Sequence, residues 1–586
     1  MTRPVQILEL RQARCDLRFG VGTCTATGSP KCFQTFHTCG ARDVYNTDGQ
    51  LSWYFTRPGD PAPRTADLPS ADEWHGPTIP ILRTVKTNPA RLNIGAARES
   101  EGPYGLRGEV SITLDDFEFR NQFGDFYASE RTVQGSLGRL LLAWLGEAVP
   151  QLEMFLYTGV EGDALADMTV RQYDVTNMDP PSNGQWTISG RDPLDRAGRK
   201  KATFPRATDI TLATAINSST TTIDVIGVEA DISDAFGNTG DTRYIRFGDE
   251  IVSYTGYTGT EPDWTLSGVI RGALATVADS HSVDAGGQRV GHYLNSPYWK
   301  AAYDVLLNHT TLTSDLFDYA TGWTYEGTTY LSTMIGTGTW TSPTPVEDVT
   351  GEMMRDGMFS LWWDERSQLI KMLANRQPTS TPQEITERSN IVASAIQRTP
   401  GDRLTRVTIN YGRGNPTLSI DEPGNYENVR ARIDGTAELP SYADGSIRDQ
   451  LIYSRMIRSD FNSILVGVLL LQRYVETPQY IDLTLAYKDA DVQIGDILNV
   501  TSYDVIDTLG NPIAKPWQVI EWEEVEPGAK YRVLGQSYTL FDRPSFIMAN
   551  DAPDFATATD AEKINACFIT ENDGTMPDGS VGYVLQ

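Results

Sequence analysis

Apolar and polar residues alternate along much of this chain, as they do in strands that bury one face. The pattern is clear within residues 106–135, where polar residues separate Val110, Ile112 and Leu114. Shorter alternating runs recur over residues 208–290 with turn residues between them, which predicts a small sandwich or barrel. We therefore predict a mainly β fold with α+β elements.

Helical spacing of apolar residues is confined to a few stretches of the sequence. Residues 136–149, 297–310 and 344–358 predict short helices, and residues 446–475 carry the longest helical signal. Residues 359–373 have the pattern of a strand, a turn and a second strand. Helices should therefore be a minority that packs among sheets.

The length of 586 residues predicts several folded units, because a single hydrophobic core rarely grows beyond roughly 250–300 residues. A basic, polar stretch before residue 208 suits a boundary and indicates that the block after it is an inserted domain. The expected units are an N-terminal cysteine-cluster segment (1–60), a first β domain (61–207), the inserted β-sandwich or barrel (208–290), an α+β domain (291–475), a C-terminal β domain (476–550) and an extended C-terminal tail (551–586).

The chain is acidic, with 77 Asp and Glu residues against 49 Lys and Arg residues and a formal charge of −28. Such a protein does not hold nucleic acid by neutralising phosphates. A conduit that meets DNA only in transit and an ordinary soluble protein both fit this charge, and net charge alone does not separate them. Its most apolar stretches, residues 137–149 and 464–471, are too short to span a bilayer, which predicts no stable membrane insertion. The first residues lack the apolar run of a secretory signal, so folding in a cytoplasm is expected.

Four cysteines, Cys15, Cys24, Cys32 and Cys39, lie close together in the sequence, whereas the fifth, Cys567, is remote. Four thiolates can hold an iron–sulfur cluster or saturate a tetrahedral zinc ion. The CxxC pairs of zinc ribbons are absent. Late disulfides and unlinked buried thiols are the other interpretations that stay open. In every bonded case we expect a structural role, because the segment is poor in aliphatic residues.

No set of residues in the sequence indicates catalysis. The five histidines show no metal-binding spacing, and no nucleophile elbow, P-loop or dinucleotide-binding glycine motif is present. The acid pairs Asp115-Asp116 and Asp364-Glu365 are expected in turns or on solvated faces. The pair Trp362-Trp363 is expected in the core, with an interface as the alternative. We predict no catalytic residues and no enzyme.

Three segments of the sequence resemble hub proteins at the tail tip, or baseplate, of long-tailed (siphovirus-like) bacteriophages and gene transfer agents. The first resembles their N-terminal cysteine motif through the four cysteines and through Phe19-Gly20, Lys31-Cys32-Phe33, Thr35 and Thr38-Cys39. The second is similar to a recurring phage tail module through Gly248, Glu250, Arg271, Gly272 and His281. The third, residues 345–376, is similar to a helix and hairpin of the same hubs.

The resemblance implies a virion structural protein, a homotrimer with two β-barrel-like hub domains in each chain and the inserted domain on the outside. Such a hub links the distal tail protein ring to the central tail fibre or tip protein. It encloses the C-terminus of the tape-measure protein and forms part of the conduit for DNA ejection. Its expected location is the virion tail tip, after synthesis in the host bacterial cytoplasm.

The resemblance also implies a cofactor, because cysteine clusters of related tail-tip proteins are associated with iron–sulfur ligation. Cys15, Cys24, Cys32 and Cys39 are then the expected ligands of a [4Fe–4S] cluster, with zinc or no metal as the alternatives.

Two other functions stay open at this point. The Thr-, Trp- and Tyr-rich residues 208–345 would suit a carbohydrate- or receptor-binding protein on the tail exterior. A tail-associated cell-wall hydrolase would need a Cys–His pair, paired carboxylates or a metal triad, and the histidine pattern supplies none of these.

Overall fold

The computed structural model of the chain describes residues 3–27, 32–60, 75–96, 101–120, 134–376, 382–442, 445–489, 491–526, 529–538 and 559. Strands dominate, which confirms the predicted mainly β fold with α+β elements. Within these residues no helix is long and apolar enough to cross a membrane. Cys567 and, apart from residue 559, the expected tail at 551–586 lie outside the described residues.

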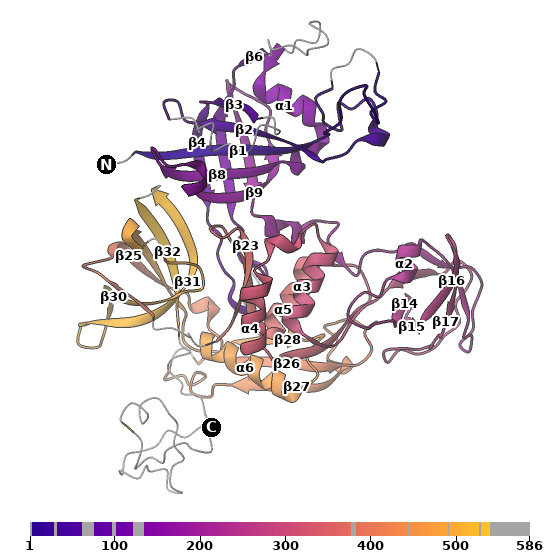
Figure 1. The fold of residues 1–586 in the computed structure, drawn as a ribbon. Coiled ribbons are helices and arrows are strands. Elements are labelled where there is room, and N and C mark those ends of the chain that lie inside the picture. The colour runs from indigo at the N-terminus through magenta and orange to yellow at the C-terminus, as the bar shows by residue number, and fades with distance from the viewer. Residues whose placement is uncertain are drawn as a thin grey trace.

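The N-terminal unit is an eight-stranded sheet that curves into a half-barrel (Figure 1). It is covered on one side by α1 (Leu137–Leu145), whose Leu137, Leu141 and Leu145 enter the apolar core of the sheet. A short hairpin of β6 (Glu118–Arg120) and β7 (Gln134–Ser136) precedes α1. The strands of the sheet in spatial order are β3 (His75–Ile79), β2 (Gly49–Thr56), β1 (Pro4–Arg14), β8 (Glu153–Val160), β9 (Thr169–Met178), β10 (Gln185–Arg191), β5 (Glu109–Asp115) and β4 (Leu82–Asn88).

Two features of this unit follow from local sequence. Asn183 and Gly184, between β9 and β10, both have a left-handed φ, of 53° and 74°, which is the conformation that an Asn-Gly turn favours. β1 and β2 lie on either side of the cysteines, so residues 1–60 supply two strands of the half-barrel as well as the cysteine loop between them.

The inserted domain projects from one side of the molecule as a seven-stranded sheet (Figure 1). Alternating residues of its strands enter a core of its own, among them Val225, Ile245, Phe247, Tyr254 and Leu266. It contains one short helix, α2 (Glu229–Ser233). The strands in spatial order are β15 (Glu250–Tyr254), β14 (Arg243–Phe247), β18 (Gly286–Arg289), β12 (Ile210–Leu212), β13 (Ile223–Ile226), β17 (Asp263–Ser267) and β16 (Gly256–Thr260).

The middle unit holds the largest apolar core and most of the helices. Helices α3 (Tyr298–His309), α4 (Thr324–Thr329), α5 (Val346–Gly357) and α6 (Asp460–Tyr474) pack with short strand pairs and one three-stranded sheet. The strand pairs are β11 (Thr203–Phe204) with β21 (Thr344–Pro345), β19 (Gly291–Pro297) with β20 (Ile335–Trp340), and β22 (Phe359–Asp364) with β23 (Leu369–Ala374). The three-stranded sheet has the order β27 (Tyr426–Ile433), β26 (Arg406–Arg413), β28 (Asp449–Tyr453).

The stretch predicted as the longest helix divides into two elements. Its first part forms the strand β28, and α6 starts only at Asp460. The hydroxyl of Ser459 accepts a hydrogen bond from the amide of Asn462 at 3.1 Å, so Ser459 caps the helix there.

The C-terminal unit is a six-stranded sheet, the second half-barrel of the chain. Its strands in spatial order are β24 (Gln383–Thr386), β30 (Ile497–Ile506), β31 (Pro512–Glu526), β32 (Lys530–Ser537), β29 (Gln479–Ala486) and β25 (Ile391–Arg398). β24 and β25 therefore come from residues assigned to the α+β domain at 291–475. β24 pairs in parallel with β30, and an alternating pattern cannot reveal such a partner because the two strands lie far apart in the sequence.

A buried arginine joins the two half-barrels and the middle unit. Arg171 of β9, with a side chain only 5% exposed, lies 2.7 Å from Glu524 of β31 and 3.4 Å from Glu365, which follows β22. Burial raises the pKa of Glu365, and the nearby Arg171 opposes that rise. Arg91 adds a second link to the C-terminal sheet, an ion pair with Glu521 at 2.7 Å. The three units thus meet around paired charges that are withdrawn from water.

We predict that Arg171→Ala lowers the free energy of unfolding by about 3–5 kcal/mol, because it leaves two buried carboxylates without their cation. Chemical denaturation followed by intrinsic fluorescence measures this change. Arg83→Ala is the control, because Arg83 pairs with Asp115 on the surface and should contribute little. Equal effects of the two substitutions would contradict the role of Arg171.

Candidate functional site

The cysteine loop, residues 15–48, is held against the first half-barrel by residues of the cysteine motif. The ring of Phe33 stacks on Trp144 of α1 with 4.4 Å between centroids. The hydroxyl of Thr35 donates a hydrogen bond to the carbonyl oxygen of Trp144 at 2.5 Å. The amide of Cys15 donates to the carbonyl oxygen of Gln34 at 2.9 Å, which closes the loop on itself. The motif therefore supplies anchors as well as thiols.

The structure brings the four cysteines of the loop close enough for their charges to interact. Burial raises the pKa of the Cys32 thiol, and Cys39, Cys15 and Cys24 each raise it further. Cys15 is buried and the other three are half-buried, and none of these four forms a disulfide. The four thiols are therefore not used in disulfide bonds.

Backbone amides point at two of these sulfurs. The amide of Gln34 donates to the Cys32 sulfur at 3.3 Å, and the amide of Ala41 donates to the Cys39 sulfur at 3.4 Å. Hydrogen bonds of this kind stabilise thiolates and tune iron–sulfur clusters. The donor set and its amides therefore fit such a group chemically.

The side chains of the loop would still have to converge to hold a single ion. Among the described residues, no three His, Cys, Asp or Glu side chains are arranged so that they could hold a metal ion. Ligation by Cys15, Cys24, Cys32 and Cys39 stays a prediction.

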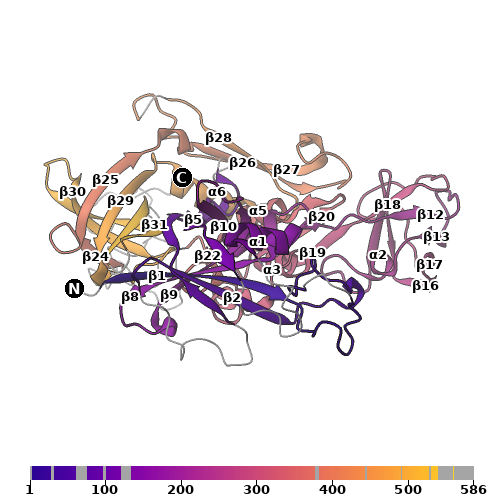
Figure 2. The same cartoon turned by 90° about the horizontal axis from the view of Figure 1, so that it is seen from above.

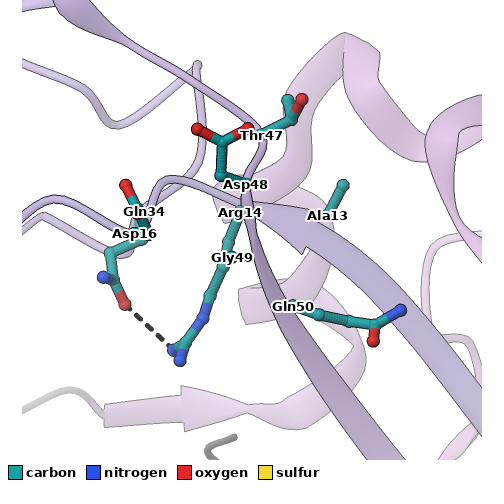
Figure 3. A pocket seen from close by; sticks show the side chains of 8 residues that line it. All are labelled: Ala13, Arg14, Asp16, Gln34, Thr47, Asp48, Gly49 and Gln50. Atoms are coloured by element: carbon teal, nitrogen blue, oxygen red, sulfur yellow. Dashed lines mark hydrogen bonds between the residues drawn. The ribbon is translucent and has the colours of Figure 1, made fainter.

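A polar hollow of about 530 Å³ lies where the cysteine loop leaves the sheet (Figure 3). Arg14, at the end of β1, donates a hydrogen bond across it to the side-chain oxygen of Gln34 at 2.9 Å. Gln34 also carries the amide that points at Cys32, so this contact couples the sheet to the sulfur group. The hollow is lined by Ala13, Arg14, Asp16, Gln34, Thr47, Asp48, Gly49 and Gln50.

The second motif forms a carboxylate clamp within the inserted domain. Glu250 has a fully buried side chain, and its oxygens accept hydrogen bonds from Arg271 at 2.6 and 2.7 Å. The amides of Gly272 and Asp279 donate at 3.0 and 3.1 Å, and Nε2 of His281 lies 2.8 Å away. Burial alone would raise the pKa of Glu250, but these hydrogen bonds lower it to about 2. Every charged member of the motif thus has a structural partner.

The glycines of the motif allow the clamp to close. Gly272 has a φ of +63°, and a Cβ there would lie 3.0 Å from backbone atoms of Ala278 and Thr276. Gly248 also has a left-handed φ, of +55°, in the turn between β14 and β15. Larger residues at these positions would strain the backbone that carries Glu250 and Arg271.

The third segment, α5 with β22 and β23, delivers residues to the junction of the three units. Trp362 and Trp363 are both buried, and Trp362 packs in an apolar cluster with Ile520 and Leu534 of the C-terminal sheet. Glu365 pairs with the buried Arg171, so this carboxylate of the Asp364-Glu365 pair has a structural partner. Glu365 lies in the turn after β22, as expected, but its ion pair with Arg171 could not be predicted, because that partner is distant in the sequence.

Two of the described histidines, His281 and His292, have clear structural contacts. His281 belongs to the Glu250 clamp. His292 is buried, and its Nδ1 lies 2.9 Å from the hydroxyl of Thr339. Burial lowers the pKa of His292 to about 4. Both contacts are of the kind that holds strands and loops in place.

No protein-family model matches the chain, and no curated protein matches it in sequence. Solved structures with a similar chain path include the 43 kDa tail protein of prophage MuSo2 from Shewanella oneidensis, with 11% identity and a TM-score of 0.30 over 78% of this chain and 97% of that one. They also include prophage tail protein gp18 from Listeria monocytogenes EGD-e, with 7% identity and a TM-score of 0.29 over 77% and 88%.

A chain in the virion of a native gene transfer agent particle has 10% identity and a TM-score of 0.28 over 66% of this chain and 82% of that one. All three are tail or virion proteins by description. Because these superpositions are loose, function has to be argued from the residues of the chain.

We predict that Glu250→Gln lowers the stability of the inserted domain by about 3 kcal/mol, because Arg271 then loses its buried counter-charge. Hydrogen exchange of the amides in residues 208–290, measured on the full chain, reports the local free energy of unfolding and so measures the effect. Asp249→Asn is the matched control, since Asp249 is adjacent but its side chain is 87% exposed. A similar loss in both variants would argue against the clamp.

The clamp should also make the inserted domain sensitive to acid. The pKa of Glu250 lies below the ordinary value of 4.5, so its contribution is complete above about pH 4.5 and is lost as the pH falls towards 2. Melting temperatures of wild type and Glu250→Gln, measured from neutral to acid pH, should converge over that window. A constant difference between them would contradict the prediction.

Proposed function

We propose that the chain is a structural hub protein of a phage tail tip, which links the distal tail ring to the central tip or fibre. The observation that carries the proposal is the cysteine loop. Its resemblance to the hub motif extends beyond the thiols to Phe33 and Thr35, and these side chains dock the loop on the first half-barrel. A motif that both carries the thiols and docks the loop on the half-barrel is typical of a structural role.

The architecture suits such a hub. One chain contributes two half-barrels held to one middle unit, and three copies of the chain would place six half-barrels around an axis. A threefold ring of this kind can join a sixfold tail ring to a threefold tip. The acidic character of the chain suits a conduit that DNA passes without binding, beyond the end of the tape-measure protein.

The cysteine loop would hold a [4Fe–4S] cluster that fixes its shape, with Cys15, Cys24, Cys32 and Cys39 as ligands. The support is that all four thiols belong to one loop without a disulfide and that two amides point at sulfur. A cluster bound there would link the end of β1 to the start of β2 across the loop. Its expected role is structural, as a brace for a segment with few apolar side chains.

Protein purified without oxygen should contain about four irons and four acid-labile sulfides per chain. Cys32→Ser should lose most of both, whereas Cys567→Ser, which alters the remote fifth cysteine, should keep them. Iron and sulfide assays, together with the absorption spectrum, measure the outcome. One zinc ion per chain and no acid-labile sulfide would contradict the cluster and indicate a mononuclear zinc site instead.

In particles that depend on this chain, antibody labelling should place it at the tail tip. Complementation with Cys32→Ser should yield fewer complete tails than complementation with Cys567→Ser, as counted by electron microscopy. Deletion of residues 208–290 should leave tail assembly intact, since that domain has its own core. Normal tails in the absence of the whole chain would refute the hub role.

A further inference from the structure

Gln34, in the cysteine loop, has a backbone conformation that a residue with a side chain rarely adopts. Its φ is +58°, in the left-handed region that favours glycine. A residue in this conformation persists only where surrounding contacts hold it, and such residues cluster at functional sites. Gln34 lies two positions after Cys32, so the strained backbone belongs to the cysteine motif itself.

The backbone of Gln34 contacts two of the four cysteines. Its amide donates to the sulfur of Cys32 at 3.3 Å, and its carbonyl oxygen accepts from the amide of Cys15 at 2.9 Å. The φ and ψ of a residue set the direction of its carbonyl group relative to its amide. The left-handed conformation therefore lets one residue face Cys32 with its amide and Cys15 with its carbonyl oxygen.

A second amide of the loop shows what the left-handed conformation adds. Ala41 lies two positions after Cys39 and donates to its sulfur at 3.4 Å, which is the same local contact that Gln34 makes with Cys32. Ala41 has an ordinary φ of −135°. The bond from amide to sulfur thus needs no unusual backbone. What is particular to Gln34 is the additional contact with Cys15.

The side chain of Gln34 is anchored to the end of the sheet. Arg14, the last residue of β1, donates to its side-chain oxygen at 2.9 Å (Figure 3). Gly49 of β2 lies opposite Arg14 in the register, and a Cβ there would lie 3.3 Å from Cγ of Arg14. The glycine therefore leaves room for the arginine that holds Gln34.

The residues on either side of Gln34 are fixed as well. Phe33 stacks on Trp144, and the hydroxyl of Thr35 donates to the carbonyl oxygen of Trp144. Gln34 is thus held between α1 on one side and the end of β1 on the other. These contacts supply the constraint that a left-handed glutamine requires.

We propose that Gln34 is a positioning residue of the cysteine site, held in its left-handed conformation by Arg14 so that it places Cys15 beside the Cys32 segment and gives the Cys32 thiolate an amide donor. The inference rests on the proposed function only for the metal group that the thiols would bind. Gln34 is not itself a ligand, because it acts through the two cysteines. A metal centre bound by them would be tuned by the hydrogen bond to its sulfur.

The test measures how fast iodoacetamide alkylates Cys32 in the reduced, metal-free full chain at neutral pH. Peptide mass spectrometry reads the rate, with Cys24 as the internal reference. An amide that donates to sulfur favours the thiolate, which is the form that reacts. Gln34→Ala and Arg14→Ala should each slow Cys32 by about three- to tenfold, because the loss of thiolate outweighs its gain in nucleophilicity. General loosening of the loop would instead speed both cysteines.

Further variants separate the side-chain anchor from the backbone. The double variant Arg14→Ala/Gln34→Ala should be no slower than Gln34→Ala, because both changes break the same bond. Gln34→Glu keeps an acceptor for Arg14 and should restore the wild-type rate. Gln34→Gly should keep more of that rate than Gln34→Ala, since glycine takes the left-handed φ freely. Arg57→Ala is the matched control, because it removes an Arg–Gln bond of the same kind, to Gln6 at 2.6 Å, and should leave Cys32 unchanged.

Alkylation of Cys32 that is unchanged or faster in both Gln34→Ala and Arg14→Ala would overturn the inference. Melting curves identify a variant that fails to fold, and the other then decides, because the two remove opposite ends of one hydrogen bond. Where wild type carries iron and sulfide, Gln34→Ala should also lower the reduction potential, since the donor stabilises the more negative reduced form. A wild type without iron or sulfide would contradict the proposed cluster, and the alkylation rates would still decide the role of Gln34.

Discussion

The arrangement of the units depends on the ion pairs of Arg171 with Glu365 and Glu524. One guanidinium from the first half-barrel pairs with a carboxylate of the middle unit and with another of the second half-barrel. Charges withdrawn from water are costly unless they are paired, so the units must pack in an arrangement that keeps Arg171 against both Glu365 and Glu524. An apolar cluster that contains Trp362, Ile520 and Leu534 also joins the middle unit to the C-terminal sheet, and the paired charges favour one orientation of that contact.

The inserted domain uses the same physical device on a smaller scale. Glu250 is buried beneath a loop and is surrounded by donors from Arg271, Gly272, Asp279 and His281. This explains why the motif combines a carboxylate, an arginine, a glycine and a histidine across a wide gap in the sequence. The charged residues stabilise a loop, and they require no ligand to account for their presence.

The cysteine loop is held by other means. It has few apolar side chains of its own, and it is held because Phe33 and Thr35 contact Trp144 of α1 in the half-barrel. Its four thiols form no disulfide, and amides of the loop point at two of them. A cluster bound by these thiols would add the covalent constraint that the loop otherwise lacks.

The local pattern of the sequence was enough to predict α1, α3 and α5 and the strands with clear alternation, such as β5, but it missed others, among them β1 and β2. Alternation in β5 and helical spacing in α5 depend on neighbours a few positions apart, and each segment must bury one face whatever its partner. Helix ends were harder, because the start of α6 depends on the cap at Ser459. The cysteine loop was visible as a candidate site because its residues are close in sequence.

Contacts between distant residues could not be predicted in this way. Nothing near Glu365 in the chain indicates that it meets Arg171, and nothing near β24 indicates that it pairs with β30. These partners meet only when whole units pack. The packing decides which charges become buried next to each other and which strands lie side by side. The sequence therefore specifies which residues form each element and carry each motif. The packing of the elements specifies which charges are buried together and which strands pair.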